Sequence, residues 1–218
     1  MAGEDFLSVT GIVLKAQPVG ESDRRITILT SSKGKIGAFA RGARKPNSRF
    51  AAGTCSFAFG NFRLYAGRDS YNLADIEITN YFEPLRMDVE AAAYASYFAE
   101  IADYYGRENS DEKDMLKLLY RSLQALSSRQ FSFPFVKCVF ELKSIAIAGE
   151  YPGIPGDMEL LDGTKQALSF IGQTPPEKIY SFRVSEEALS ELRRVAEIYR
   201  ARYMDHNFKS LEILNALC

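Results

Sequence analysis

Apolar and polar residues alternate with a period of two along most of residues 6–80, a pattern typical of half-buried β-strands. In residues 35–41, Ile36, Ala38 and Ala40 share one face, and the residues between them share the other. With its turn residues, the pattern predicts five strands, at about residues 7–16, 24–30, 35–41, 54–65 and 71–78. Five short strands favour a small barrel, and a partly open five-stranded barrel that binds oligonucleotides is the OB-fold.

From Pro84 onward the apolar period becomes that of an α-helix. The pattern predicts a helix that ends near Gly106, a second capped by Ser110, and a largely apolar third over residues 133–148. Ser185 is expected to cap a fourth helix, and residues 208–217 a last one. Residues 150–182 are rich in Gly and Pro and predict an irregular excursion with a short helix near residues 165–171.

The predicted fold class is therefore α+β, an N-terminal five-stranded OB-fold barrel followed by an all-α helical domain. The expected domains are a nucleic-acid-binding barrel over residues 1–80 and a helical domain over residues 81–218. The excursion at about residues 150–182 contains no Cys or His, so the helical domain is expected to lack zinc.

Charge is strongly segregated, although the formal net charge is only −1. Residues 1–80 carry eleven Lys or Arg against seven Asp or Glu, and the remainder carries sixteen against twenty-one. Residues 24–68 contain ten basic residues and no acidic one, with aromatic residues between them. Such a stretch attracts polyanions, and exposed aromatic faces can stack on bases. A solvated sheet surface with its aromatic residues in the core is the alternative reading of the same pattern.

The candidate nucleic-acid-binding residues combine this charge with the strand alternation. The second and third strands are expected to place Arg25, Lys35, Phe39 and Arg41 on a common outer surface, followed by the most basic loop of the chain. The full candidate set is Arg24, Arg25, Lys35, Phe39, Arg41, Arg44, Lys45 and Arg49.

The sequence offers little for catalysis or metal binding. There is one histidine, His206, and the three cysteines lack C-x-x-C spacing. We therefore predict no enzymatic activity, no cofactor and no metal. Scattered cysteines, the absence of a recognisable signal peptide and the charges within the longest apolar run predict a cytoplasmic protein that does not associate with membranes.

Several segments resemble the RecO family of bacterial DNA repair proteins. They are Gly11-Ile12-Val13-Leu14-Lys15, Gly20-Glu21-Ser22-Asp23, residues 41–50, Tyr65-Ala66-Gly67-Arg68, and Phe140-Glu141-Leu142 followed by Gly149. The resemblance is strongest over residues 6–80. It implies an N-terminal OB-fold, a helical domain and DNA contacts on the basic residues of the candidate set. Many family members also carry a four-cysteine zinc ribbon, which this chain lacks.

The resemblance further implies a recombination mediator that binds single- and double-stranded DNA, anneals complementary strands and helps to load the recombinase RecA. Its implied partners are RecR, single-strand-binding protein and, in some lineages, RecF. Lys117, Arg121, Arg129 and Lys137 are candidates to receive the acidic tail of single-strand-binding protein. An OB-fold protein that binds RNA or acts as a scaffold is the alternative.

Overall fold

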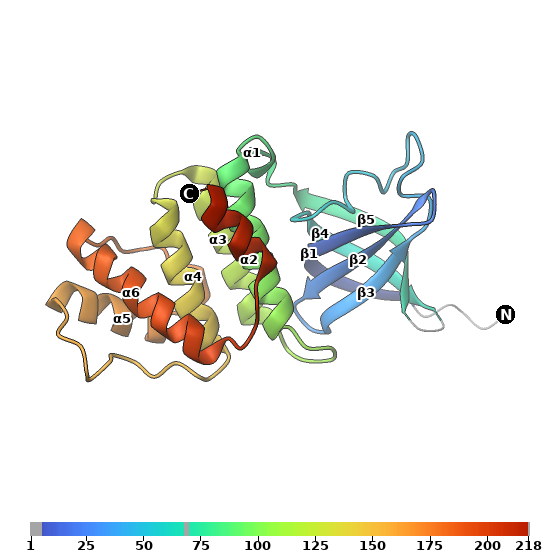
Figure 1. Ribbon diagram of the computed structural model, residues 1–218. Coiled ribbons are helices and arrows are strands. Elements are labelled where there is room, and N and C mark those ends of the chain that lie inside the picture. The colour runs from blue at the N-terminus through green and yellow to red at the C-terminus, as the bar shows by residue number, and fades with distance from the viewer. Residues whose placement is uncertain (1–5, 68–69, 218) are drawn as a thin grey trace. The chain divides into compact units, whose positions relative to one another are not determined.

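Five strands at the start of the chain close into a barrel (Figure 1). The computed structural model describes residues 6–67 and 70–217, so Arg68 and Cys218 lie outside the described residues. The strands are β1 (Phe6–Val19), β2 (Asp23–Thr30), β3 (Gly34–Ala40), β4 (Phe59–Ala66) and β5 (Tyr71–Asn80). Their order around the barrel is β1-β2-β3-β5-β4, with β1 also pairing with β4. The predicted α+β class with an OB-type barrel is confirmed.

The alternation seen in the sequence places the barrel core. Ile26 and Ile28 of β2, and Phe62 and Leu64 of β4, are fully buried. A register shift after Val13 marks a bulge in β1, which lets this long strand bend and pair with both β2 and β4. Gly11 lies where β1 passes between these partners, and a Cβ there would come within 2.5 Å of the Leu29 carbonyl oxygen.

The connection from β3 to β4 covers an end of the barrel. We predicted a strand from residue 54, but β4 begins at Phe59 and residues 49–57 form turns. Ala43, Thr54 and Ala58 are fully buried, and Ala43 and Ala58 belong to the barrel core. The apolar residues of this segment fill the barrel interior without pairing in the sheet, which is why their pattern imitated a strand.

The remaining elements are helical. They are α1 (Glu83–Arg86), α2 (Val89–Tyr105), α3 (Lys113–Ser128), α4 (Phe133–Ile147), α5 (Asp162–Gln173), the 3-10 helix η1 (Pro176–Lys178), α6 (Glu186–Tyr203) and α7 (Lys209–Leu217). α2 and α4 meet through Phe98 and Phe140, whose stacked rings are 4.3 Å apart. None of the helices within residues 6–67 and 70–217 is long and apolar enough to span a membrane.

Two compact units divide the chain. The barrel through Glu83 groups with Ala102–Leu116, and Pro84–Ile101 groups with the chain from Lys117 onward. We call them the barrel unit and the helical unit. We predicted a division at residue 80, with residues 102–116 in the helical domain; by their contacts these residues group with the barrel.

One predicted helix cap is wrong, one predicted helix is longer than expected, and another cap is confirmed. Ser110 does not cap a helix, because its hydroxyl donates to the Arg107 carbonyl and α3 begins at Lys113. The polar residues before α3 instead return to the barrel, where Lys35 N donates to the Arg107 carbonyl at 2.9 Å. The helix expected near residues 165–171 extends over Asp162–Gln173. Ser185 caps α6 as predicted, accepting a hydrogen bond from Ala188 N at 3.3 Å.

Candidate nucleic-acid interface

The outer surface of β2 and β3 carries an arginine beside an aromatic ring. Arg25 is exposed and lies opposite the half-buried Phe39 in the sheet register. Its guanidinium carbon is 5.9 Å from the centre of the Phe39 ring. A Cβ on Gly37 would be 3.8 Å from Arg25 Nη2, so the guanidinium extends over this glycine. Arg25 and Phe39 thus form a neighbouring pair on the sheet surface.

The first residues after β3 add three exposed basic side chains, Arg41, Arg44 and Lys45. Their backbone is fastened to the β1–β2 turn, because Arg44 N donates to the Ser22 carbonyl at 2.8 Å. Gly42, at a φ of 66°, donates its N–H to the Asp23 carboxylate at 2.7 Å. Asp23, the first residue of β2, therefore orders the loop, and the three basic side chains stay at the Arg25 end of β2.

Lys15 belongs to the same surface, although sequence reasoning missed it. It is exposed on β1 and pairs in register with Thr27 of β2, whose side chain also points outward. The alternation around it could have identified it, since Ala16 packs against the barrel core. We call this surface the basic face, made of Lys15, Arg25, Phe39, Arg41, Arg44 and Lys45. Among the residues that the structure describes, none of its five basic side chains pairs with a carboxylate.

On the basic face, Arg44 Nη1 also donates to the Gly20 carbonyl at 3.1 Å. The other three predicted site residues are not on this face and are held by contacts elsewhere in the barrel unit. Arg24 Nη1 donates to the Ala51 carbonyl at 2.7 Å and to the Thr54 hydroxyl at 2.9 Å. Lys35 pairs with the Asp103 carboxylate at 3.0 Å. Arg49 pairs with Asp75 at 3.4 Å and lies over the Phe50 ring. The structure therefore brings five of the eight predicted residues together on the basic face. The other three, Arg24, Lys35 and Arg49, form hydrogen bonds or ion pairs within the barrel unit.

Replacing Arg24 by Ala is expected to lower the free energy of unfolding by about 1–3 kcal/mol, because the buried Thr54 hydroxyl loses its charged donor. The β3–β4 connection, which Arg24 holds through Ala51 and Thr54, should also become more accessible to protease. Chemical denaturation and limited proteolysis would measure these effects. Arg25→Ala is the matched control, since it removes an exposed arginine from the next position and should change stability by less than about 0.5 kcal/mol. Equal stability of the two variants would contradict this role for Arg24.

The helical unit contains a buried ionic cluster. The Glu141 carboxylate is fully buried, accepts a hydrogen bond from the Tyr97 hydroxyl at 2.5 Å and pairs with Lys137 at 3.0 Å. Arg200 Nε lies 3.8 Å from the same carboxylate. Burial first, and then the charge of Glu141, raise the pKa of Tyr97 far above its usual range, so this phenol stays protonated. Tyr97, Glu141 and Lys137 thus link α2 to α4 inside the unit.

His206 lies 3.8 Å from Glu100, but the arrangement is not that of a hydrolase triad. The Ser210 hydroxyl donates to the Glu100 carboxylate, which also accepts the N–H of Lys209 and Ser210. Burial acts to raise the pKa of Glu100, but these hydrogen bonds lower it overall. Glu100 thereby anchors the start of α7. Within the described part of the chain, no three His, Cys, Asp or Glu residues are grouped so that they could hold a metal ion.

The strand order and the exposed basic face define the class of protein, an OB-fold barrel joined to a helical unit. Two family models match the chain, recombination protein O N terminal over residues 5–82 and recombination protein O C terminal over residues 86–154. The chain belongs to the RecO family.

Curated relatives agree with this assignment. The DNA repair protein RecO of Acetivibrio thermocellus is 29% identical, with 98% of each chain covered. The DNA repair protein RecO of Clostridium novyi is 27% identical over 99% of this chain and 97% of its own. That of Symbiobacterium thermophilum is 33% identical over 67% of this chain and 58% of its own.

Proposed function

We propose that this protein acts in DNA repair and recombination by binding single-stranded DNA on the basic face and annealing complementary strands. In this role it helps to load the RecA recombinase and also binds double-stranded DNA. The observation that carries the proposal is the basic face itself, five basic side chains that no carboxylate of the described residues pairs with, beside a half-buried aromatic ring. Membership of the RecO family, and its similarity to DNA repair proteins of that family, support it.

The basic face is suited to phosphates more than to particular bases. If each of its five basic side chains neutralises one phosphate, affinity for single strands should fall with salt at a log–log slope of roughly −3 to −4. Phosphate contacts position the strand without reading its sequence, so base preference should be weak. Phe39 can stack on one base, which explains how a strand with unpaired bases would be favoured over a duplex.

Annealing of two complementary oligonucleotides labelled for energy transfer tests the proposal. We expect the protein to accelerate annealing without ATP, because the mechanism is the neutralisation of phosphates and needs no chemical step. RNA strands should be tested in parallel. Equal binding of RNA and DNA without acceleration of annealing would favour the alternative of an RNA-binding or scaffold protein.

The helical unit offers a groove for the acidic, apolar tail of single-strand-binding protein. The groove has a volume of about 430 Å³, and its lining includes Phe131, Tyr180, Ala125 and Arg121. Of the four basic candidates, Lys117 pairs with Glu177, Arg129 with Asp88 and Lys137 with Glu141. Arg121 has an amide partner, Gln124, at 3.0 Å and, among the described residues, no carboxylate within ion-pair distance. Glu177, which also lines the groove, is paired with Lys117. Arg121 is therefore the candidate that we favour.

Arg121→Glu is expected to weaken binding of the tail peptide at least tenfold, because a charge-assisted hydrogen bond to its carboxylates is replaced by repulsion. Calorimetry with the peptide would measure this. Arg129→Glu is the control, since Arg129 is also exposed but is already paired with Asp88. No binding of the peptide at concentrations of about 100 µM would refute this partner surface. Pull-down experiments would test RecR and RecF.

A further inference from the structure

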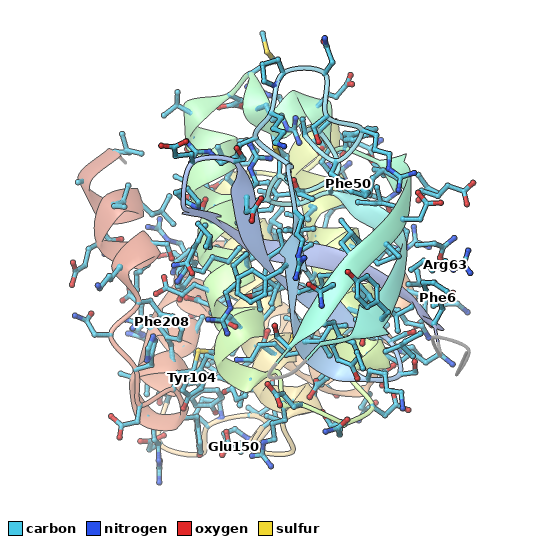
Figure 2. All side chains as sticks on the ribbon, turned by 90° about the vertical axis from the view of Figure 1, so that its right-hand side faces the viewer. Phe6, Phe50, Arg63, Tyr104, Glu150 and Phe208 are labelled. Carbon is cyan, nitrogen blue, oxygen red and sulfur yellow. The ribbon has the colours of Figure 1, made fainter. Side chains whose placement is uncertain are left out.

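A second cluster of aromatic and basic side chains lies on the outer surface of β1 and β4. Phe6 is opposite Tyr65 in register, and the next outward pair is Ser8 with Arg63. The Arg63 guanidinium carbon is only 4.0 Å from the centre of the Phe6 ring. The Tyr65 ring meets Phe6 edge to face, with ring centres 6.3 Å apart. Figure 2 shows Phe6 and Arg63 side by side on the outside of the strands.

This cluster is open to solvent, and in the described part of the chain its arginine has no carboxylate partner. Phe6 is 42% exposed, although a large aromatic ring gains from burial. Asp75 faces Arg63 in the register between β4 and β5, but it is paired with Arg49 at 3.4 Å. Among the described residues, Arg63 therefore has no ion-pair partner. The Arg63 guanidinium is stacked on the exposed Phe6 ring. No carboxylate of the described residues forms an ion pair with its N–H groups.

We propose that Phe6, Arg63 and Tyr65 form a second site for single-stranded nucleic acid, one that binds by stacking on bases. Guanidinium and aromatic planes both stack on bases, with little dependence on sequence. Few phosphate contacts are expected here, because the carboxylates of Asp75 and Glu77, on the adjoining outer surface of β5, repel phosphates. The site should therefore depend only weakly on salt, in contrast to the basic face.

The barrel order separates the two sites. β1 takes part in both sites: Phe6 lies in its first half, which pairs with β4, and Lys15 lies in its second half, which pairs with β2. The other residues of the second site are on β4, which is next to neither β2 nor β3. Two strands could thus be held at once by one chain, which is what annealing requires. The role of the second site in annealing rests on the proposed function, but Phe6, Arg63 and Tyr65 are not residues of the basic face.

Photochemical cross-linking with a short bromodeoxyuridine oligonucleotide, followed by mass spectrometry of the peptides, tests the second site. We expect adducts on Phe6 or Tyr65 as well as on Phe39. Raising salt from about 50 mM to about 300 mM should remove the Phe39 adduct and largely spare the other. Phe6→Leu keeps an apolar side chain and Arg63→Lys keeps the charge, yet each should reduce the adduct at the second site about tenfold by removing a planar group.

Ser8→Ala is the matched control, since Ser8 is exposed on the same strand between the same neighbours and should change nothing. Adducts on Phe39 alone would overturn the second site and leave the proposed function standing. Adducts on neither surface would overturn both. Adducts on Phe6 or Tyr65 that are unchanged by Phe6→Leu and Arg63→Lys would also overturn stacking as the basis of the site.

Discussion

Simultaneous replacement of Arg41, Arg44 and Lys45 by Glu is expected to reduce affinity for single-stranded DNA at least about a hundredfold at moderate salt. Each reversal removes a phosphate contact and adds a repulsive charge at the same place. Annealing should be lost with binding. Fluorescence anisotropy of a labelled oligonucleotide, repeated at several salt concentrations, would measure both the affinity and a slope reduced by about two.

This triple variant should remain folded. The three side chains are exposed, and the backbone of their loop is held by Gly42 N on Asp23, Arg44 N on Ser22 and the buried Ala43. Circular dichroism would verify this. Reversal of Lys165, Arg194 and Arg202, three exposed residues of the helical unit, makes the same change in net charge and should leave affinity nearly unchanged. A folded loop variant with unaltered affinity and salt slope would show that the basic face is not the DNA site.

Glu141→Ala is expected to destabilise the helical unit by about 3–5 kcal/mol. The substitution leaves Lys137 without its carboxylate in a side chain that is only 18% exposed, and it removes the acceptor of the buried Tyr97 hydroxyl. Burial of these groups makes the loss costly, because water cannot replace the missing partner. Chemical denaturation followed by circular dichroism would measure the change in the free energy of unfolding.

Asp162→Ala provides the comparison for Glu141→Ala. Asp162 and Lys165 form an ion pair at 3.5 Å in which the Asp162 side chain is 91% exposed. Loss of such a pair should cost at most about 0.5 kcal/mol. Similar effects for the two variants would mean that the buried cluster does not stabilise the helical unit.

The barrel could be predicted from sequence because alternation with a period of two is a local property. The alternation correctly placed Arg25 and Phe39 on one outer surface, opposite Ile26 and Ala38 in the core. The alternation could not show that Arg24 makes contacts inside the barrel unit whereas Arg25 stays exposed. Arg24 binds Ala51 and Thr54, and these contacts between distant residues appear only when the β3–β4 connection folds over the barrel.

Other contacts at the candidate sites could not be predicted either, because they also join residues that are distant in the sequence. Lys35 seemed to be a surface cation, but its partner Asp103 is 68 positions away in α2. The cluster of Phe6 with Arg63 and Tyr65 also escaped notice, because the two halves come from strands that meet only when the barrel closes. Charge composition identified a basic stretch correctly, yet the division of that stretch into exposed and engaged residues is a property of the fold.

The return of residues 106–112 to the β2–β3 turn has a consequence for how this barrel can be inherited or transplanted. The Gly34–Glu108 bridge and the bond from Lys35 N to Arg107 make this segment part of the barrel, and a Cβ on Gly106 would lie 3.3 Å from Leu29 Cδ1. A gene fragment that ends at residue 83 would encode all five strands but omit this covering. The fully buried Leu29 would then face water. The barrel unit is thus discontinuous in sequence. A recombined gene that is to encode a complete barrel unit must include the later segment as well as the five strands.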